Sequence, residues 1–344
     1  MAHHSRAAPL FIYLPPFAPA PGEHVELPDV LQPWPIAVIR YRWGDTHQTH
    51  QISEDDEALP SLQWPTPVHD TAFAFEWVTQ ALAPDKVARR DIYVYGSHLG
   101  ASLAASLGLT ESHPHAKFSV RGVVAYNGIY NWTMFLPDHR INRPSTRAKG
   151  VVTPPQPVEG SHLHILQNQL RDLFEKPGSL FDPFASACLL FHGPGLLIPK
   201  SFTMSSADAA NVDALASGQP SLLGAFKPPR RSHMVFPPRK STLKIPPTLL
   251  LHDTPNLVSP IKRLRSVRKG NSFGTQAGEL GELMRRSVDK IELKMRSRWD
   301  EDMEGWEGEA ERRVRVVDVG EETEELALNE VGQAAVESWL DEVM

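Results

Sequence analysis

The chain has 344 residues, 41% of them hydrophobic, which is enough to bury one large core. Its 35 Lys and Arg against 41 Asp and Glu residues give a formal net charge of -6, which excludes a global electrostatic attraction to nucleic acid or anionic membranes. The single cysteine, Cys188, excludes an intramolecular disulfide and a cysteine-based zinc site. We expect it to be a small buried apolar side chain.

The sequence carries no recognisable membrane or targeting segment. No run approaches the roughly 18 consecutive apolar residues that a membrane-spanning helix needs. The N-terminal stretch MAHHSRAAPLFIYL lacks the long apolar region and the small-residue cleavage site of a secretory signal. Together with the use of one cysteine, this predicts a cytoplasmic protein.

Short β-type runs and helical periodicities alternate in the first part of the chain. Strands are expected at Leu10 to Leu14, Ile36 to Tyr41, Asp91 to Tyr95 and Val120 to Tyr126, and helices at Val68 to Leu82 and over residues 101–109. The helix after Tyr95 consists of small and apolar residues, which suits a buried position against a sheet. The alternation predicts an α/β fold with a doubly wound, mostly parallel sheet.

The alternation stops after Asn131 and resumes near the C-terminus. Residues 132–246 are rich in proline and contain one predicted helix, at Leu163 to Phe174. Because structureless loops of such length are rare inside compact domains, we interpret 132–246 as a lid or cap insertion. The sheet is expected to resume at Thr248 to Leu251. A last strand at Val314 to Val319 and a helix at Leu326 to Val343 then complete a single domain, 1–344.

A second, charged insertion is predicted at 261–311. It contains a helix with both charge signs at i, i+4 spacing, Leu280 to Met295, which we expect to be exposed and self-supporting. Trp299 and Trp306 follow in an acidic turn and are interpreted as local core anchors. The segment begins with a basic cluster, which is interpreted as a solvated loop, with a docking patch for an acidic partner as the alternative. The cluster consists of Lys262, Arg263, Arg265, Arg268 and Lys269.

The sharpest local motif is YGSHLG at residues 95–100, between a predicted buried strand and a small-residue helix. In a G-x-S-x-G nucleophile elbow, the glycines permit a strained turn that lifts the middle side chain above the sheet, beside the N-terminus of the next helix. Gly96 and Gly100 have the required spacing. The residue at the tip is His98 instead of serine.

These residues resemble the hormone-sensitive-lipase-like esterases of the α/β-hydrolase superfamily. The segments that carry the resemblance are YRW, VHDTAFAFEWV, YGSHLGASLAASL, SLFDPFASACL and IPPTLLLHD. Together they span most of the chain. The resemblance implies an α/β-hydrolase-type sheet with a lid insertion and a site related to carboxylesterases and lipases.

The catalytic triad that the resemblance implies is incomplete in this sequence. The nucleophile position holds His98, and Ser97 lies one residue early, where a tight turn points its hydroxyl in another direction. The triad acid falls near Asp253, which is a loose match. The base should be a histidine shortly after the last strand, but no histidine follows His252.

The oxyanion loop also departs from the family pattern. Where the family has HGGG, this chain has Pro15-Pro16-Phe17-Ala18. Prolines provide no N–H, and Phe17 replaces a glycine that lets substrate approach the backbone. The N–H groups of Phe17, Ala18 and Leu99 remain candidates for a partial anion pocket.

The closely spaced histidines do not predict a metal site. None of the pairs is joined by the carboxylate or cysteine pattern of a metal centre, and such pairs in loops are usually solvated surface. The pairs are His3 and His4, His47 and His50, His113 and His115, and His162 and His164. We therefore expect neither a metal nor another cofactor.

Three functions remain open from the sequence. The leading interpretation is a catalytically inactive α/β-hydrolase-fold protein that binds a small apolar or acyl ligand or serves as an interaction scaffold, since removing a triad member typically costs about 10⁴–10⁶-fold in rate. The alternative is an active carboxylic-ester hydrolase with a rearranged triad that uses Ser97 and a lid histidine such as His233. The third is a subunit of a larger assembly that binds a protein partner through 261–311.

Overall fold

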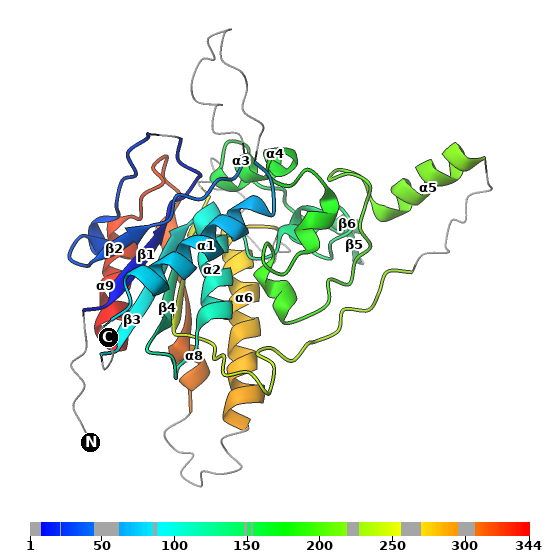
Figure 1. The fold of residues 1–344 in the computed structure, drawn as a ribbon. Coiled ribbons are helices and arrows are strands. Elements are labelled where there is room, and N and C mark those ends of the chain that lie inside the picture. Colours follow the sequence, from blue (N-terminus) through cyan, green and yellow to red (C-terminus); the bar gives the residue numbers. More distant parts are fainter. Residues whose placement is uncertain are drawn as a thin grey trace.

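The central element of the fold is a six-stranded parallel sheet (Figure 1). The computed structural model describes residues 8–20, 22–44, 62–84, 88–147, 150–152, 154–218, 227–255, 270–294 and 307–344. The strand order is β2-β1-β3-β4-β7-β8, and every neighbouring pair is parallel. The strands are β1 (Leu10–Leu14), β2 (Ile36–Val38), β3 (Arg90–Ser97), β4 (Phe118–Tyr126), β7 (Thr248–Thr254) and β8 (Val314–Glu321). The predicted parallel sheet is confirmed.

Helices cover both faces of this sheet, as a doubly wound fold requires. One face packs against α1 (Thr66–Ala81), α2 (Leu99–Glu111) and α6 (Phe273–Ser287). The other face packs against the short helix η1 (Asp29–Leu31) and α9 (Glu330–Val343). Side chains that alternate along each strand feed these two separate cores. The predicted fold class is therefore confirmed.

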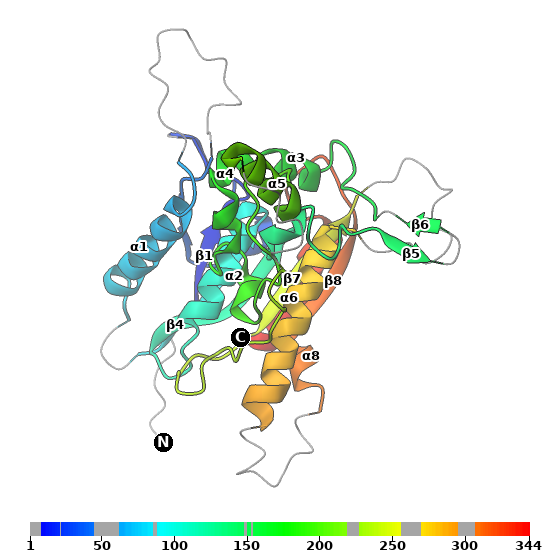
Figure 2. The same cartoon turned by 90° about the vertical axis from the view of Figure 1, so that its right-hand side faces the viewer.

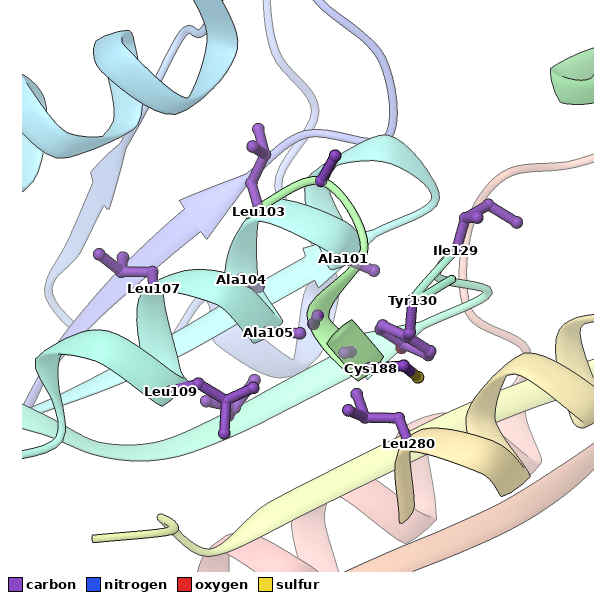
Figure 3. Packing of buried hydrophobic residues seen from close by; sticks show 14 of the residues in the cluster. Ala101, Leu103, Ala104, Ala105, Leu107, Leu109, Ile129, Tyr130, Cys188 and Leu280 are labelled. Carbon is purple, nitrogen blue, oxygen red and sulfur yellow. The ribbon is translucent and has the colours of Figure 1, made fainter. Parts of the chain in front are cut away.

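Helix α2 lies at the centre of the larger core (Figure 3). Its small residues allow the helix to approach the sheet closely, and a Cβ added to Gly108 would lie only 2.3 Å from Cγ2 of Val123. Cys188 reaches the same core from the lid segment and is fully buried. Burial raises the pKa of its thiol well above the usual value. The prediction of a buried apolar cysteine is confirmed.

The described part of the segment after β4, which the sequence predicts to be a lid and which is called the lid segment below, contains seven short elements and the helix α5. They are η2 (Trp132–Phe135), β5 (Ser145–Arg147), β6 (Gly150–Val152), α3 (His162–Asn168), α4 (Leu170–Phe174), η3 (Pro177–Phe181), η4 (Ala187–Leu190) and α5 (Ser206–Ser217). The single helix predicted at Leu163 to Phe174 is thus two helices, α3 and α4. Trp132 packs on Phe174 with ring centroids 4.9 Å apart, so this part of the lid segment shares the main core. Figure 2 shows α3 and α4 above α2.

The charged helix of the second insertion is buried, and the expectation that it is exposed was wrong. Phe273, Ala277, Leu280 and Met284 of α6 are at most 2% exposed. They recur at i, i+4, i+7 spacing and form an apolar stripe, while the charged residues lie on the remaining faces. The helix is the crossover connection between β7 and β8, and it continues as the π-helical segment η6 (Val288–Leu293). Helix α8 (Glu309–Arg313) then leads into β8.

Some sequence-based interpretations lie outside the described residues. The basic cluster between Lys262 and Lys269, and both Trp299 and Trp306, belong to this group. Within the described ranges, no helix combines the length and the apolar character that crossing a membrane requires.

Candidate functional site at the strand-to-helix turn

The turn between β3 and α2 has the strained geometry of a nucleophile elbow. His98 at its tip has φ 50° and ψ -113°, a conformation that non-glycine residues rarely adopt. A Cβ on Gly96 would lie 2.3 Å from the carbonyl oxygen of Gly100, and one on Gly100 would lie 2.3 Å from the carbonyl oxygens of Leu14 and Pro15. Only glycine fits either position, so the G-x-x-x-G spacing encodes the turn.

The imidazole of His98 is enclosed by aromatic rings. It is 0% exposed, and the ring of Phe17 stacks on it with centroids 5.9 Å apart. Tyr126 and Phe273 approach its edge at 5.7 and 5.9 Å. Neither ring nitrogen has a hydrogen-bond partner among the described residues. Burial, with a smaller contribution from His162, lowers the pKa of His98 to about 3, so the ring is neutral at physiological pH.

Ser97 faces a different side of the sheet from the tip of the turn. It is the last residue of β3 and is 4% exposed. Side chains alternate along a strand, which places Ser97 on the same face as Tyr93 and Tyr95, the face that packs against α9. The hydroxyl of Ser97 therefore does not occupy the nucleophile position.

A second imidazole reaches the elbow, but it comes from the lid. His162, the first residue of α3, lies edge-on to His98 with ring centroids 5.2 Å apart. Its Nδ1 is 3.2 Å from Oε1 of Glu322, and its backbone N–H donates to the same oxygen at 2.6 Å. The His162 side chain is only 13% exposed, so the interpretation of this histidine as solvated surface was wrong.

Glu322 occupies the position after the last strand at which a base histidine was expected from the sequence. It follows β8 directly, and its backbone N–H donates to the carbonyl of Thr254 at 2.9 Å. Burial, together with the nearby charge of Asp253, raises the pKa of the Glu322 carboxyl. Sequence reasoning missed the pairing of His162 with Glu322, because 160 residues separate them and no local motif links them.

Asp253 lies at the end of β7 and joins two strands. Its Oδ2 accepts hydrogen bonds from the hydroxyl of Tyr126 at 3.0 Å and from Nδ2 of Asn127 at 2.7 Å. Its Oδ1 has no partner among the described residues. Burial raises the pKa of Asp253, and the bonds from Asn127 and Tyr126 oppose that rise. The described contacts give this carboxylate a role in connecting β4 to β7.

One of the three candidate oxyanion donors, the N–H of Leu99, is engaged within the chain. The N–H of Leu99 already donates to the carbonyl of Pro16 at 3.0 Å. The hydroxyl of Tyr41 donates to the carbonyl of Pro15 at 2.7 Å and fixes the same loop. Phe17 and Ala18 are half-buried and pack against the main core. An oxyanion would have to displace Pro16 from Leu99 before that donor became free.

The other lid histidine considered from the sequence lies far from the turn. Nε2 of His233 contacts Nη1 of Arg286 at 2.9 Å, near the C-terminal end of α6. Phe273, which touches His98, is 13 residues earlier on that helix, about 20 Å along its axis. Within the described ranges, no group of three or more His, Cys, Asp or Glu side chains is arranged to hold a metal ion.

Comparison with known proteins finds similar solved structures. An esterase of the hyperthermophilic archaeon Pyrobaculum calidifontis aligns over 99% of this chain and 76% of its own, with 15% identity and a TM-score of 0.46. A thermophilic carboxylesterase from a metagenomic library aligns over 99% and 82%, with 13% identity and a TM-score of 0.45. A hormone-sensitive lipase from a metagenome library aligns over 98% and 79%, with 11% identity and a TM-score of 0.44. No sequence-family model and no curated protein sequence matches the chain.

The architecture can be classified from its own geometry. Six parallel strands carry helices on both faces, and a strained strand-to-helix turn projects one side chain at the carboxyl edge of the central strand β3. A strained strand-to-helix turn at the carboxyl edge of a parallel sheet is a distinguishing feature of the α/β-hydrolase fold. The chain has an α/β-hydrolase-type fold with His98 at the elbow.

Proposed function

We propose that this chain is a catalytically inactive α/β-hydrolase-fold protein that acts by binding and not by ester hydrolysis. The observation that carries the proposal is the state of the elbow tip. The neutral imidazole of His98 is 0% exposed, has no hydrogen-bond partner among the described residues and is covered by Phe17. A nucleophile needs access to substrate and a base in hydrogen-bond contact, and the His98 ring has neither.

Two further features support the loss of hydrolysis. The oxyanion donor at Leu99 is engaged with Pro16, and removing one such donor typically costs about 10²–10³-fold in rate. The position of the base after β8 holds Glu322, a carboxylate, instead of an imidazole. These defects are independent of the replacement at His98, and a member of the triad alone is worth about 10⁴–10⁶-fold.

The packing around the elbow also bears on what the chain binds. The lid contributes His162, Trp132 and Phe174 to the region above the sheet, and the space around His98 is filled by the chain's own rings. A small acyl ligand under the lid therefore requires the lid to move. We favour a binding surface away from the elbow. The alternative role that we propose is that of a cytoplasmic scaffold, which binds a protein partner through 261–311.

One observation favours the competing function, an ester hydrolase with a rearranged triad. His162 is a lid histidine beside the elbow, and Glu322 lies within ion-pair distance of it, as the acid of a triad does. The position of Ser97 on the α9 face of the sheet argues against this function, since the hydroxyl would have to cross the strand to reach His162.

The decisive experiment measures hydrolysis of short p-nitrophenyl esters by the wild type, His98→Ser and Ser97→Ala. We expect no turnover above the solvent rate by any of the three, and no labelling of the wild type by a fluorophosphonate. Turnover by the wild type that disappears in Ser97→Ala would establish the rearranged hydrolase. Turnover by His98→Ser alone would show that only the nucleophile is missing and that His162 with Glu322 is a competent base.

A further inference from the structure

A cleft lies at the opposite end of the sheet from the elbow. Its volume is about 230 Å³, and it opens between the segment that precedes β7 and the end of α6 with the π-helical segment η6. The N–H of Lys244 donates to the carbonyl of Ser112, just after α2, so the cleft sits beside the amino ends of the strands. Helix α6 has 15 residues, which separates the cleft from the elbow by about 22 Å. In Figure 1 this segment, in yellow-green, passes below α2.

The lining of the cleft combines an apolar floor with cationic groups. Leu243, Ile245 and Ile291 supply the apolar surface, while Arg239 and Lys244 supply positive charge. Arg239 is exposed and makes no hydrogen bond or ion pair with the described residues. An apolar cavity with a few convergent polar groups is typical of small-molecule sites.

The charged side chains that line the cleft, Arg239 and Lys244 against Glu292, leave an excess of one positive charge. Glu292 is the one acidic lining residue, and its Oε2 accepts from Nη1 of Arg313 at 2.7 Å. Its Oε1 is 3.9 Å from Nζ of Lys244, the outer limit of an ion pair. If Lys244 balances Glu292, the guanidinium of Arg239 remains to attract a monovalent anion.

The helical wall of the cleft departs from regular α-helix. Ile291 and Glu292 belong to η6, whose six residues are π-helical. Such turns are rare and are frequently found at functional sites. The π-helical geometry of this wall and the positive charge of the lining are two separate observations, and both are made at the same cleft.

We infer that this cleft binds a small organic monocarboxylate, with the carboxylate on Arg239 and a short apolar body against Leu243, Ile245 and Ile291. The inference gives the binding role proposed above a site and a ligand class, and in that sense rests on it. The volume is below the roughly 300–1,000 Å³ of pockets for drug-sized ligands, so the ligand is small.

Isothermal titration calorimetry with hexanoate at low ionic strength tests the inference on the full chain. We expect saturable binding at one site, weakened about tenfold (about 1.4 kcal/mol) in Arg239→Gln, since that variant loses the charged hydrogen-bond donor to the carboxylate. Arg230→Gln is the matched control, because Arg230 is exposed in the same segment, carries the same charge and does not line the cleft. It should bind like the wild type, and hexan-1-ol should bind at least tenfold more weakly than hexanoate.

Several results would overturn the inference. The first is an absence of hexanoate binding by the wild type, and the second is equal binding by Arg239→Gln. The third is inorganic phosphate that binds as tightly as hexanoate, which would mean that the cleft recognises charge alone. Loss of hexanoate binding in His98→Phe with no change in Arg239→Gln would move the ligand to the elbow. Ester turnover by a wild type whose hexanoate binding depends on Arg239 would refute only the proposed loss of hydrolysis.

Discussion

The elbow and the contact between the lid segment and α6 each bury a polar side chain, but among the described residues only the second side chain has hydrogen-bond partners. At the elbow, His98 is completely buried and has no hydrogen-bond partner among the described residues. At the lid contact, Glu279 of α6 has a side chain that is 7% exposed and is surrounded by donors. An unpaired buried polar group destabilises a fold, whereas a satisfied one holds its partners in place. The comparison indicates that hydrogen bonds and ion pairs hold the lid segment against α6, whereas the His98 ring is held by packing against other rings.

The donors around Glu279 come from the lid segment and from Asn131, which directly precedes it. Oε2 accepts from Nδ2 of Asn131 at 3.1 Å, and Oε1 accepts from Arg231 and from Nη2 of Arg140 at 3.4 Å. The ring of His192 lies 3.6 Å from Oε1. Burial alone would raise the pKa of Glu279, but the His192 contact, the charge of Arg231 and the bond from Asn131 lower it to about 2. Three separate parts of the lid region thus meet on one core carboxylate.

The largest effect is expected from Glu279→Ala. Removing the carboxylate leaves Arg231, His192 and Asn131 without their acceptor, and breaking a buried ion pair in this way costs about 3–5 kcal/mol. Urea unfolding followed by circular dichroism measures the change. Glu282→Ala is the control, because Glu282 is exposed on the same helix. A loss no larger than that of the control would show that the lid does not depend on this cluster.

The second prediction concerns acid stability. The folded pKa of Glu279 is about 2 and the unfolded value is about 4.3, so the folded state is favoured above the unfolded pKa and loses that advantage as pH falls toward 2. The difference corresponds to roughly 3 kcal/mol. We expect Glu279→Gln to lose less stability than the wild type between pH 4.5 and pH 2 by roughly 2.5 kcal/mol, because at pH 2 half of the folded carboxyl groups are still ionised. Parallel stability-pH curves for the two proteins would contradict the role of this carboxylate.

The smallest effect is expected at the elbow, from His98→Phe. Phenylalanine keeps the ring among Phe17, Tyr126 and Phe273 and removes two unpaired nitrogens, so stability at pH 8 should be unchanged or slightly higher. The folded pKa of about 3 lies below the unfolded value of about 6.5, so the wild type loses stability as pH falls below about 6.5. At pH 5 the variant should be more stable by roughly 2 kcal/mol.

Unfolding curves at pH 8 and pH 5 measure this difference. The exposed His115 provides a matched control, because His115→Phe replaces an imidazole that is not buried. If His98→Phe is strongly destabilised at pH 8, the imidazole makes a polar contact that the elbow needs, and the contrast with Glu279 fails.

Local patterns predicted the sheet and the elbow turn well. The strand positions follow from short apolar runs, and the turn follows from Gly96 and Gly100, because close backbone contacts there exclude any Cβ. The burial of α6 was mispredicted, although its apolar stripe is visible in the sequence, because charge pairs were given more weight than periodicity. His162 was also misplaced, since nothing next to it in the sequence indicates what covers it.

The parallel α/β sheet, the strained turn and the presence of His98 in place of a serine at its tip follow from the order of amino acids alone. These features depend on backbone geometry and on residues close together in the chain. Only the tertiary structure brought His162 to Glu322 and gathered the lid on Glu279, because these contacts join segments that are 160 and 48 residues apart in the chain. Long-range packing, and not local preference, decides which polar groups the folded chain buries with partners and which it buries without them.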